Sequence, residues 1–278
     1  MTFHAFPAPA KLNLSLHVVG RRADGYHLLE TVFRFIDLCD TIELAVRDDG
    51  AIVLDTPTPG VDPALDLTVR AARALQAASG TRLGASIRID KRIPMGGGLG
   101  GGSSDAATVL LALNRLWGCG LSRTALQMLG LTLGADVPVF IYGRPAFASG
   151  IGEELTTCVV PDAWYVVLHP DAHVPTAKIF ASELLTRNST ISIMRSLSDV
   201  TRRRNDMQSV VFQEFPQVAK CHQRLSEFGP ALMTGSGSCV FLECETEQQA
   251  NTVYRSVSDE YRGFVVKGLQ DHPLYETD

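Results

Sequence analysis

The sequence has no Cys-x-x-Cys pair, and its cysteines and histidines show no spacing typical of a zinc site. Its six cysteines stand far apart, so we expect free thiols in a reducing compartment instead of a disulfide framework. No apolar run is long enough to cross a bilayer, and the first eleven residues lack the basic and apolar regions of a signal peptide. These absences predict a cytoplasmic protein.

An excess of positive charge is also missing. The chain carries 25 lysines and arginines against 30 aspartates and glutamates, a net charge of -5. This balance disfavours nonspecific binding to nucleic acid or to an anionic membrane. Internal repeats and low-complexity linkers are absent as well, and 278 residues are enough for one large or two ordinary domains. We therefore expect a globular protein whose partner is neither a nucleic acid nor a membrane.

Glycine, by contrast, is concentrated in one stretch between a predicted strand and a predicted helix. Residues 85–90 alternate as a strand does, and apolar residues recur at helical spacing from 106 to 117. Such a loop gathers unpaired backbone N–H groups at the positive end of a helix dipole, which suits phosphate. The predicted phosphate-binding residues are Pro94, Met95, Gly96, Gly97, Gly98, Leu99, Gly100, Gly101, Gly102, Ser103 and Ser104, with Ser103, Ser104 and Asp105 as candidate N-caps.

Two familiar phosphate-binding loops each lack a required residue here. A P-loop needs a lysine after its glycines, and none follows. A dinucleotide-binding loop needs an acidic residue about twenty positions further on, and none occurs between Asp105 and Asp136. A flexible linker is the remaining alternative, which the helix that follows disfavours. The sequence therefore predicts a third kind of phosphate cradle.

Other polar residues have simple structural interpretations. Residues 10–19 alternate as a strand, with Lys11, Asn13, Ser15 and His17 on one face, and a solvated face is the simplest interpretation. Asp136 lies among apolar residues before a proline, where an aspartate is more often a helix N-cap than a catalyst. The residues alone thus favour structural roles for this strand face and for Asp136.

The second half of the chain predicts further strands and helices. Residues 164–169 form a strand, 176–185 a helix, and 207–228 one or two helices broken at Pro216. A second glycine turn lies between two strands within 231–241, followed by a helix over 246–261 and a strand over 263–267. The basic run 202–204 fits a solvated face, the residues after 270 a tail, and the domain boundary falls near 158–164.

Three stretches taken together resemble a known superfamily. Pro-Ala-Lys-Leu-Asn at 9–13, the glycine stretch at 94–104 and Met-Thr-Gly-Ser-Gly-Ser at 233–238 resemble the GHMP kinases, which include galactokinase, homoserine kinase and mevalonate kinase. Ala-Asp-Gly-Tyr-His at 23–27 and Leu-Gly-Ala-Asp-Val-Pro-Val-Phe at 133–140 resemble the members that act on a cytidine-diphosphate-linked methylerythritol. The resemblance covers nearly the whole chain and is weakest over 187–204 and after 270.

This resemblance implies a mixed α/β (α+β) fold of two GHMP kinase domains. Residues 1–158 would form an ATP-binding N-terminal domain similar to the second domain of ribosomal protein S5. Residues 159–278 would form a ferredoxin-like C-terminal domain. The implied reaction is transfer of phosphate from ATP, with Mg²⁺, to the 2-hydroxyl of the small-molecule substrate, in the non-mevalonate route to isoprenoid precursors.

The resemblance also implies roles for individual residues. Asp136 matches the catalytic base and Lys11 its partner, while Ser104 would offer a hydroxyl near the metal. The residues matching substrate-binding positions are Asn13, Tyr26, His27, Phe180, Gly235, Ser236 and Gly237. No residue set is predicted to hold a metal by itself, and the sequence leaves monomer and homodimer both open.

Two other functions stay open at this point. The chain could be another small-molecule kinase of the superfamily, for homoserine or mevalonate, but such a small acid needs no aromatic clamp like Tyr26, His27 and Phe180. It could instead be a nonenzymatic nucleotide or RNA binder built on the same fold. The acidic balance and the pairing of Lys11 with Asp136 disfavour that alternative.

Overall fold

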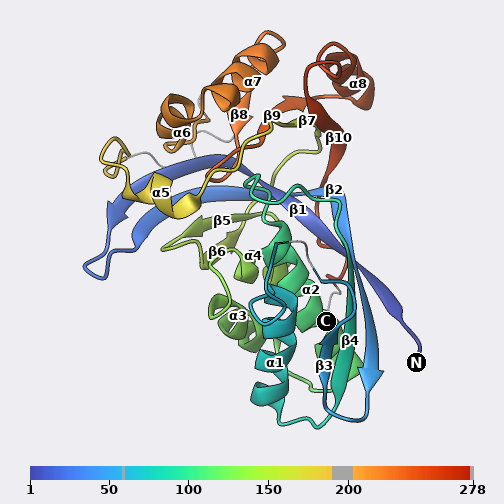
Figure 1. The fold of residues 1–278 in the computed structure, drawn as a ribbon. Coiled ribbons are helices and arrows are strands. Elements are labelled where there is room, and N and C mark those ends of the chain that lie inside the picture. The colour runs from blue at the N-terminus through green and yellow to red at the C-terminus, as the bar shows by residue number, and fades with distance from the viewer. Residues whose placement is uncertain (58–59, 190–202, 276–278) are drawn as a thin grey trace.

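A long antiparallel hairpin of the first two strands runs across the molecule, in a computed structural model that describes residues 1–57, 60–189 and 203–275 (Figure 1). Strand β1 (His4–Arg21) pairs with β2 (His27–Arg47) along its whole length, with register shifts at three points. The predicted alternation over 10–19 is therefore confirmed as strand. Elements from both halves of the chain pack on this hairpin (Figure 1).

The remaining elements largely match the predicted order. The other strands are β3 (Ile52–Leu54), β4 (Gly84–Asp90), β5 (Ala146–Ser149), β6 (Glu154–Thr157), β7 (Trp164–His169), β8 (Leu232–Met233), β9 (Val240–Cys244) and β10 (Arg262–Leu269). The helices are α1 (Leu67–Ser79), α2 (Gly101–Leu116), α3 (Arg123–Leu131), α4 (Val137–Tyr142), α5 (Thr176–Ala181), α6 (Gln208–Glu214), α7 (Pro216–Ser226) and α8 (Glu247–Arg255). Helices α5 and α8 are shorter than predicted, and Pro216 separates α6 from α7 as predicted.

The strands follow the order β3-β4-β2-β10-β7-β9-β8, with β1 and β5 also paired to β2. All pairs are antiparallel except β3 with β4. Strand β10 joins the two sets of strands, because it pairs fully with β7 and by two residues with β2. The last strand of the chain therefore ties the C-terminal half to the N-terminal hairpin.

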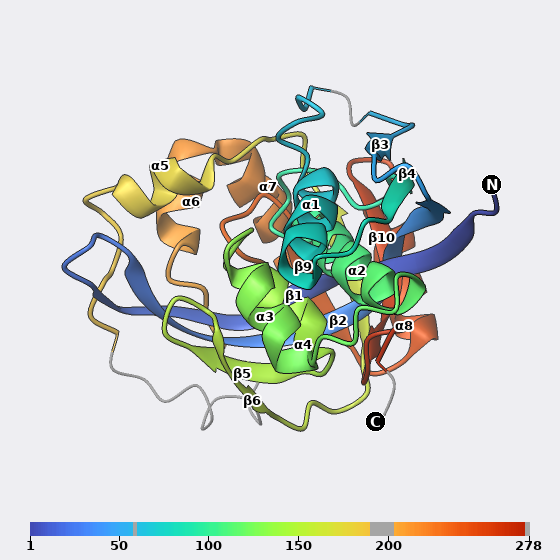
Figure 2. The same cartoon turned by 90° about the horizontal axis from the view of Figure 1, so that it is seen from below.

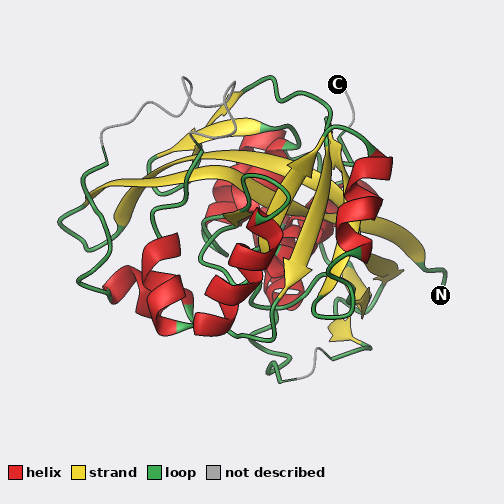
Figure 3. Cartoon of the chain, turned by 90° about the horizontal axis from the view of Figure 1, so that it is seen from above, coloured by secondary structure: helices red, strands yellow, loops and turns green. Residues whose placement is uncertain are grey.

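Three apolar clusters stack these elements into layers. The first lies between helices α1 to α4 and the face of β2 that carries Phe33 and Phe35. The second packs α6, α7 and α8 on β7 and β9, and the third fills the space between the hairpin and β7, β9 and β10. The two groups of helices are seen from opposite sides in Figure 2 and Figure 3. Since β2 alternates its side chains between the first and third clusters, both of its faces are buried.

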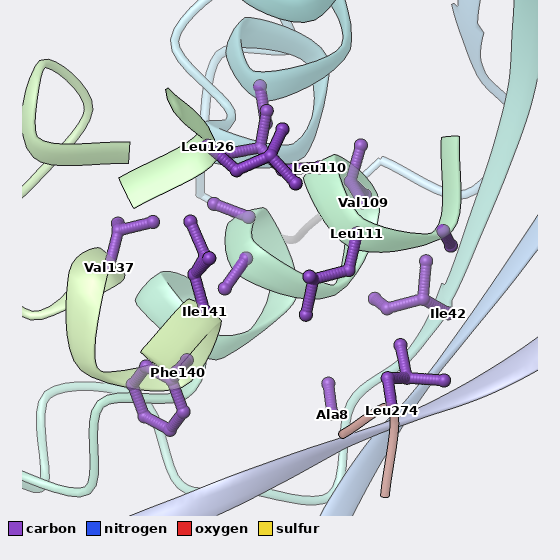
Figure 4. Close-up of a cluster of buried hydrophobic side chains, with 14 of the residues drawn as sticks. Ala8, Ile42, Val109, Leu110, Leu111, Leu126, Val137, Phe140, Ile141 and Leu274 are labelled. Carbon is purple, nitrogen blue, oxygen red and sulfur yellow. The ribbon is translucent and has the colours of Figure 1, made fainter. Parts of the chain in front are cut away.

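The first cluster also holds the end of the described chain. Figure 4 shows Leu274 beside Ala8, in the same cluster as Val109, Leu110 and Leu111 of α2. The backbone N–H of His272 donates to the carbonyl of Gly143 at 2.8 Å. The prediction of a loose tail after residue 270 is therefore wrong as far as residue 275, because these residues are hydrogen-bonded to the core.

His272 is buried in this region, so we expect the stability of the fold to fall in acid. Burial, with a further contribution from Arg123, lowers the pKa of His272 from 6.5 to about 3. The unfolded chain therefore binds a proton below pH 6.5 that the folded protein does not, so stability falls as the pH falls. At about 1.4 kcal/mol per pH unit, we expect a loss of about 2 kcal/mol between pH 6.5 and pH 5.

Urea unfolding of His272→Asn over this pH range checks the expectation. The asparagine oxygen can replace His272 Nδ1 as the acceptor of the hydrogen bond from the Leu274 N–H. The variant's unfolding free energy should fall less steeply with acid than that of the wild type. His4→Gln, at an exposed position, is the matched control and should keep the wild-type slope. Equal slopes for all three proteins would show that His272 titrates normally in the fold.

Candidate active site

A cleft of about 1040 Å³ opens between the hairpin, the glycine stretch and α5. Its walls come from segments far apart in sequence, since residues near 11–33, 61–68, 91–105, 135–136, 176–181 and 235–237 all line it. Every predicted site residue except Ser104 lies on this lining. A pocket with a few convergent polar groups is the usual form of a small-molecule site.

The glycine stretch turns sharply before it enters α2. Gly96, Gly98 and Gly100 have φ of 69°, 77° and 73°, a conformation that other residues rarely adopt. Gly100 occupies the N-cap position of α2 and makes no side-chain cap, so the first N–H groups of this helix are not capped by the residue before it. The expectation that Ser103, Ser104 or Asp105 caps the helix is wrong, because all three lie inside its first turns.

The second glycine turn packs directly against the first. The backbone N–H of Cys239 donates to the carbonyl of Gly97 at 3.0 Å, and the Thr234 hydroxyl donates to the carbonyl of Gly98 at 3.3 Å. A Cβ at Gly235 would lie only 2.9 Å from the Gly98 carbonyl oxygen. Glycine at 235 is therefore required for the two turns to approach each other.

The polar face of β1 is buried, so the interpretation as a solvated face is wrong. Lys11 and Asn13 are each 3% exposed. The Lys11 Nζ donates to Asn13 Oδ1 at 2.6 Å and lies 3.3 Å from Asp136 Oδ2. It also lies 5.5 Å from the centre of the Phe33 ring. A buried ammonium needs such partners, and here they hold it at the floor of the cleft.

Asp136 occupies the N-cap position of α4 but does not act as a cap. Its backbone is helical, with φ -86° and ψ -10°, and its side chain makes no hydrogen bond to the helix. A capping residue has an extended backbone and accepts from an N–H two or three residues on. The carboxylate instead pairs with Lys11 and is 37% exposed, on the cleft lining. The simple capping interpretation therefore fails.

The other two residues of the polar face on β1, Ser15 and His17, contact Arg204 instead of Asp136. The Arg204 Nε donates to His17 Nδ1 at 3.1 Å and lies 3.0 Å from Asp206 Oδ1. The Ser15 hydroxyl donates to the Arg204 carbonyl at 3.1 Å. Arg203 is buried and donates to Glu243 Oε2 at 2.6 Å. The prediction of a solvated basic run is thus wrong for Arg203. Arg204 remains exposed although it is hydrogen-bonded to β1, and Arg202 lies outside the described residues.

Aromatic and imidazole side chains gather at the other end of the cleft. Tyr26 is 60% exposed at the tip of the hairpin. The ring of His27 stacks on Phe180 with 4.8 Å between centroids and 23° between planes. The hydroxyls of Thr176 and Ser236 are 2.6 Å apart, so α5 contacts the second glycine turn there. These residues offer flat surfaces and hydrogen-bonding groups to a planar ring.

Two charged features of the cleft have no signal in the sequence. Lys91 pairs with both Asp40 and Asp105 beside the glycine stretch. Burial, aided by the negative charge of Asp40, raises the pKa of Asp105 to about 7, against the opposing charge of Lys91. Arg187 contacts the His27 ring from the loop after α5. Only the fold brings these residues together. Lys91 is 14 positions from Asp105 and 51 from Asp40, and Arg187 is 160 positions from His27.

Ser104 does not face the cleft. It is fully buried inside α2, and its hydroxyl has no hydrogen-bond partner. Ser103 lies on the lining instead, with its Oγ 3.9 Å from where a Cβ would lie on Gly134, just before Asp136. No group of three or more potential metal ligands occurs among the residues that the structure describes. Ser103, and not Ser104, therefore offers a hydroxyl between the glycine stretch and Asp136.

Comparisons with known proteins identify the family of the chain. Models of the GHMP kinases N terminal domain and C terminal domain match residues 66–144 and 182–263. A 4-diphosphocytidyl-2-C-methyl-D-erythritol kinase of Chromobacterium violaceum is 62% identical over 278 residues, covering 99% of this chain and 98% of that protein. A protein of the same name from Cupriavidus metallidurans is 57% identical over 273 residues, covering 96% and 94%.

Solved structures show the same likeness. The crystal structure of a 4-(cytidine 5'-diphospho)-2C-methyl-D-erythritol kinase matches with a TM-score of 0.82 at 34% identity, covering 95% of this chain and 99% of that one. A mevalonate kinase of Methanococcus jannaschii matches with a TM-score of 0.70 at 16% identity, covering 96% and 99%. The second likeness is one of fold alone. Among the described residues, no helix is both long and apolar enough to cross a membrane.

Proposed function

The chain belongs to the GHMP kinases, within the family of the 4-diphosphocytidyl-2-C-methyl-D-erythritol kinases, and we propose that Lys11 and Asp136 carry its reaction. It is an ATP-dependent kinase that phosphorylates the 2-hydroxyl of 4-diphosphocytidyl-2-C-methyl-D-erythritol, giving the 2-phosphate and ADP in the non-mevalonate route to isoprenoid precursors. The predicted fold of two GHMP kinase domains is confirmed. The homoserine, mevalonate and RNA-binding alternatives give way to this assignment.

The observation that carries the proposal is the ion pair of Lys11 with Asp136 on the cleft lining. Phosphoryl transfer depends mainly on positioning and charge stabilisation. The carboxylate of Asp136 accepts the proton of the substrate hydroxyl as that oxygen attacks the terminal phosphorus of ATP. The Lys11 ammonium lies 3.3 Å from Asp136 Oδ2, and Asn13 holds that ammonium in place through its Oδ1.

The glycine stretch is proposed to hold the ATP phosphates. Its backbone N–H groups and the start of α2 supply donors and a positive dipole end, and Lys11 lies close by because its own N–H donates to the Leu99 carbonyl at 3.0 Å. The second glycine turn, Gly235 to Gly237, covers the same region from the C-terminal half. Phosphates bound here would lie next to the catalytic pair.

Mg²⁺ is proposed to arrive with the nucleotide. This ion usually keeps several waters and is held by substrate phosphates with one or two protein groups, so the absence of a ligand cluster among the described residues suits it. Ser103 lines the cleft beside the glycine stretch and would supply an oxygen atom of the protein. When bound, the ion neutralises negative charge on the phosphates.

The cytidine end of the substrate is proposed to lie against Tyr26, whose exposed ring is free to stack on a pyrimidine. Base stacking on an aromatic side chain is worth about 1–3 kcal/mol, so we expect Tyr26→Ala to raise the KM for the cytidylated substrate about tenfold or more. The KM for ATP should not change. Steady-state kinetics with each substrate varied in turn checks this, with Tyr26→Phe as the matched control that keeps the ring. Equal losses for both substrates would remove Tyr26 from cytidine binding.

The position of phosphorylation can be read from the product by phosphorus NMR. The 2-hydroxyl sits on a carbon that carries a methyl group and no hydrogen, so a phosphate there has no proton three bonds away. The new phosphorus resonance should therefore be a singlet, while phosphorylation of a CH₂OH or CHOH group would give a triplet or a doublet. A split resonance would show that the cleft presents a different hydroxyl to ATP.

Three further features are proposals of the same kind. The division at 158/159 agrees with the first apolar cluster, which is built mostly from residues before it, and with β7, which begins at Trp164. All six cysteines are free thiols, which supports a reducing cytoplasm as the place of action. The enzyme is proposed to work as a monomer or homodimer.

A further inference from the structure

Arg187 directs its hydrogen bonds at the cytidine end of the cleft. Its Nε donates to Nε2 of His27 at 3.0 Å. Its Nη2 donates to the carbonyls of Phe180 and Ser182, at 3.0 Å and 2.6 Å, and its Nη1 donates to the carbonyl of Leu185 at 3.1 Å. Arg187 is therefore bound both to the start of β2 and to the segment that ends α5.

The contact with His27 fixes the position of the imidazole proton. A guanidinium has only donors, so the Nε2 of His27 must present a lone pair, and the neutral ring must carry its proton on Nδ1. No group within the described part of the chain hydrogen-bonds to that Nδ1, and His27 lines the cleft. The free enzyme thus presents an N–H donor to a ligand.

The charges around His27 favour the neutral ring. Burial, followed by the positive charges of Arg187 and Arg21, lowers the pKa of His27. Arg187 comes from the loop after α5, and Arg21 ends β1, so both elements present a cation to the ring. Protonation of Nε2 would also abolish the hydrogen bond from Arg187.

The contacts with the carbonyls hold Phe180 in place. Phe180 lies in the last turn of α5, where carbonyl groups lack partners within the helix and a cation is favourable. Its ring stacks on His27, so one arginine fixes both members of the stack. His27 and Phe180 are 153 positions apart, at the start of β2 and in α5, and Arg187 joins them.

We propose that Arg187 is a positioning residue for the cytidine end of the substrate. It holds His27 as a neutral ring with its proton on Nδ1, stacked on Phe180, before the substrate arrives. The inference rests on the proposed function for its ligand, but the state of His27 is a property of the free enzyme. If Arg187 only linked β2 to α5, it would not determine which nitrogen of His27 carries the proton.

Nitrogen NMR of the free enzyme with ¹⁵N-labelled histidine tests the proposal without any substrate. The chain has seven histidines, and the resonances of His27 are assigned by their loss in His27→Asn. At neutral pH the wild type should show a protonated Nδ1 and an Nε2 with a lone pair. In Arg187→Met the protonated Nε2 form should appear. A wild-type His27 protonated on Nε2 would overturn the proposal, whatever the enzyme phosphorylates.

Kinetics supply the second arm. Arg187→Met should raise the KM for the cytidylated substrate about tenfold, the loss of about one hydrogen bond from His27 Nδ1 to the substrate, and leave the KM for ATP and kcat unchanged. Arg187→Lys keeps the charge but not the fork of donors, so its KM for the cytidylated substrate should lie between those of the wild type and Arg187→Met. It replaces Arg187→Met as the test variant if that protein does not fold. Arg22→Met is the matched control, because Arg22 lies on the same hairpin and pairs with Asp24 at 2.7 Å. Equal changes in both KM values, or no change, would contradict the proposal.

Discussion

Replacing Asp136 with asparagine is expected to lower kcat by about 10²–10⁴-fold while the fold and both KM values hold. Asparagine keeps the shape of the side chain but cannot accept the substrate proton. The variant should fold normally, because Asp136 makes no helix cap, its side chain is 37% exposed, and the buried Lys11 ammonium keeps its hydrogen bond to Asn13. Its unfolding free energy, measured in urea, is the control for that statement.

Lys11→Met tests whether the pair acts as a unit. The ammonium is 3.3 Å from Asp136 Oδ2, so its removal should slow the same step. The double variant should then be much less impaired than the product of the two single effects, since residues in one mechanism are not additive. Losses that multiply would argue against joint action. A kcat for Asp136→Asn within about threefold of the wild type, far short of general-base catalysis, would remove Asp136 from the mechanism.

Gly102→Val is expected to raise the KM for ATP by about 10- to 100-fold, the loss of one charge-assisted hydrogen bond or slightly more. Gly102 lies in the first turn of α2 and on the cleft lining. A Cβ there would contact only Leu67, at 3.5 Å, so a larger side chain enters the cleft and not the core. Gly101 is a poorer choice, because its Cβ would lie 3.1 Å from Ile93 inside the protein.

Gly102→Ala is the graded partner of this variant and should give a smaller rise in KM. Both substitutions replace a helical glycine, so the unfolding free energy should stay the same or increase. The KM for the cytidylated substrate should change little, because Tyr26, His27 and Phe180 lie at the other end of the cleft. Unchanged ATP binding in a folded Gly102→Val protein would show that the phosphates bind elsewhere.

Local patterns predicted the frame of the fold. The alternation over 10–19, the apolar spacing from 106 to 117 and the break at Pro216 each depend on neighbours in sequence, and each is observed. The residues after 270 are too few to show a period, so their packing at Leu274 and His272 could not be predicted. The glycine stretch was placed correctly, but its helix begins at Gly101, before the expected caps.

The site depended on contacts that no local pattern reports. Alternation groups Lys11 with Asn13 but does not tell what covers that face, and its cover comes from Thr234, Asp136 and the glycine stretch. From the residues alone, solvation and capping were the better interpretations, and both are wrong. The resemblance to the GHMP kinases pointed to Asp136 and Lys11, because both match positions in motifs of that superfamily. Nothing in the sequence pointed to Arg187.

The most direct test of the central assignment is ADP release from ATP and Mg²⁺ with three acceptors offered in turn. With 4-diphosphocytidyl-2-C-methyl-D-erythritol, the account predicts one ADP per acceptor phosphorylated, and no release above background with mevalonate or homoserine. The Asp136→Asn variant, assayed in the same way, should be nearly inactive with all three acceptors. ADP release that depends on mevalonate or homoserine, or none with the cytidylated acceptor, would contradict the account.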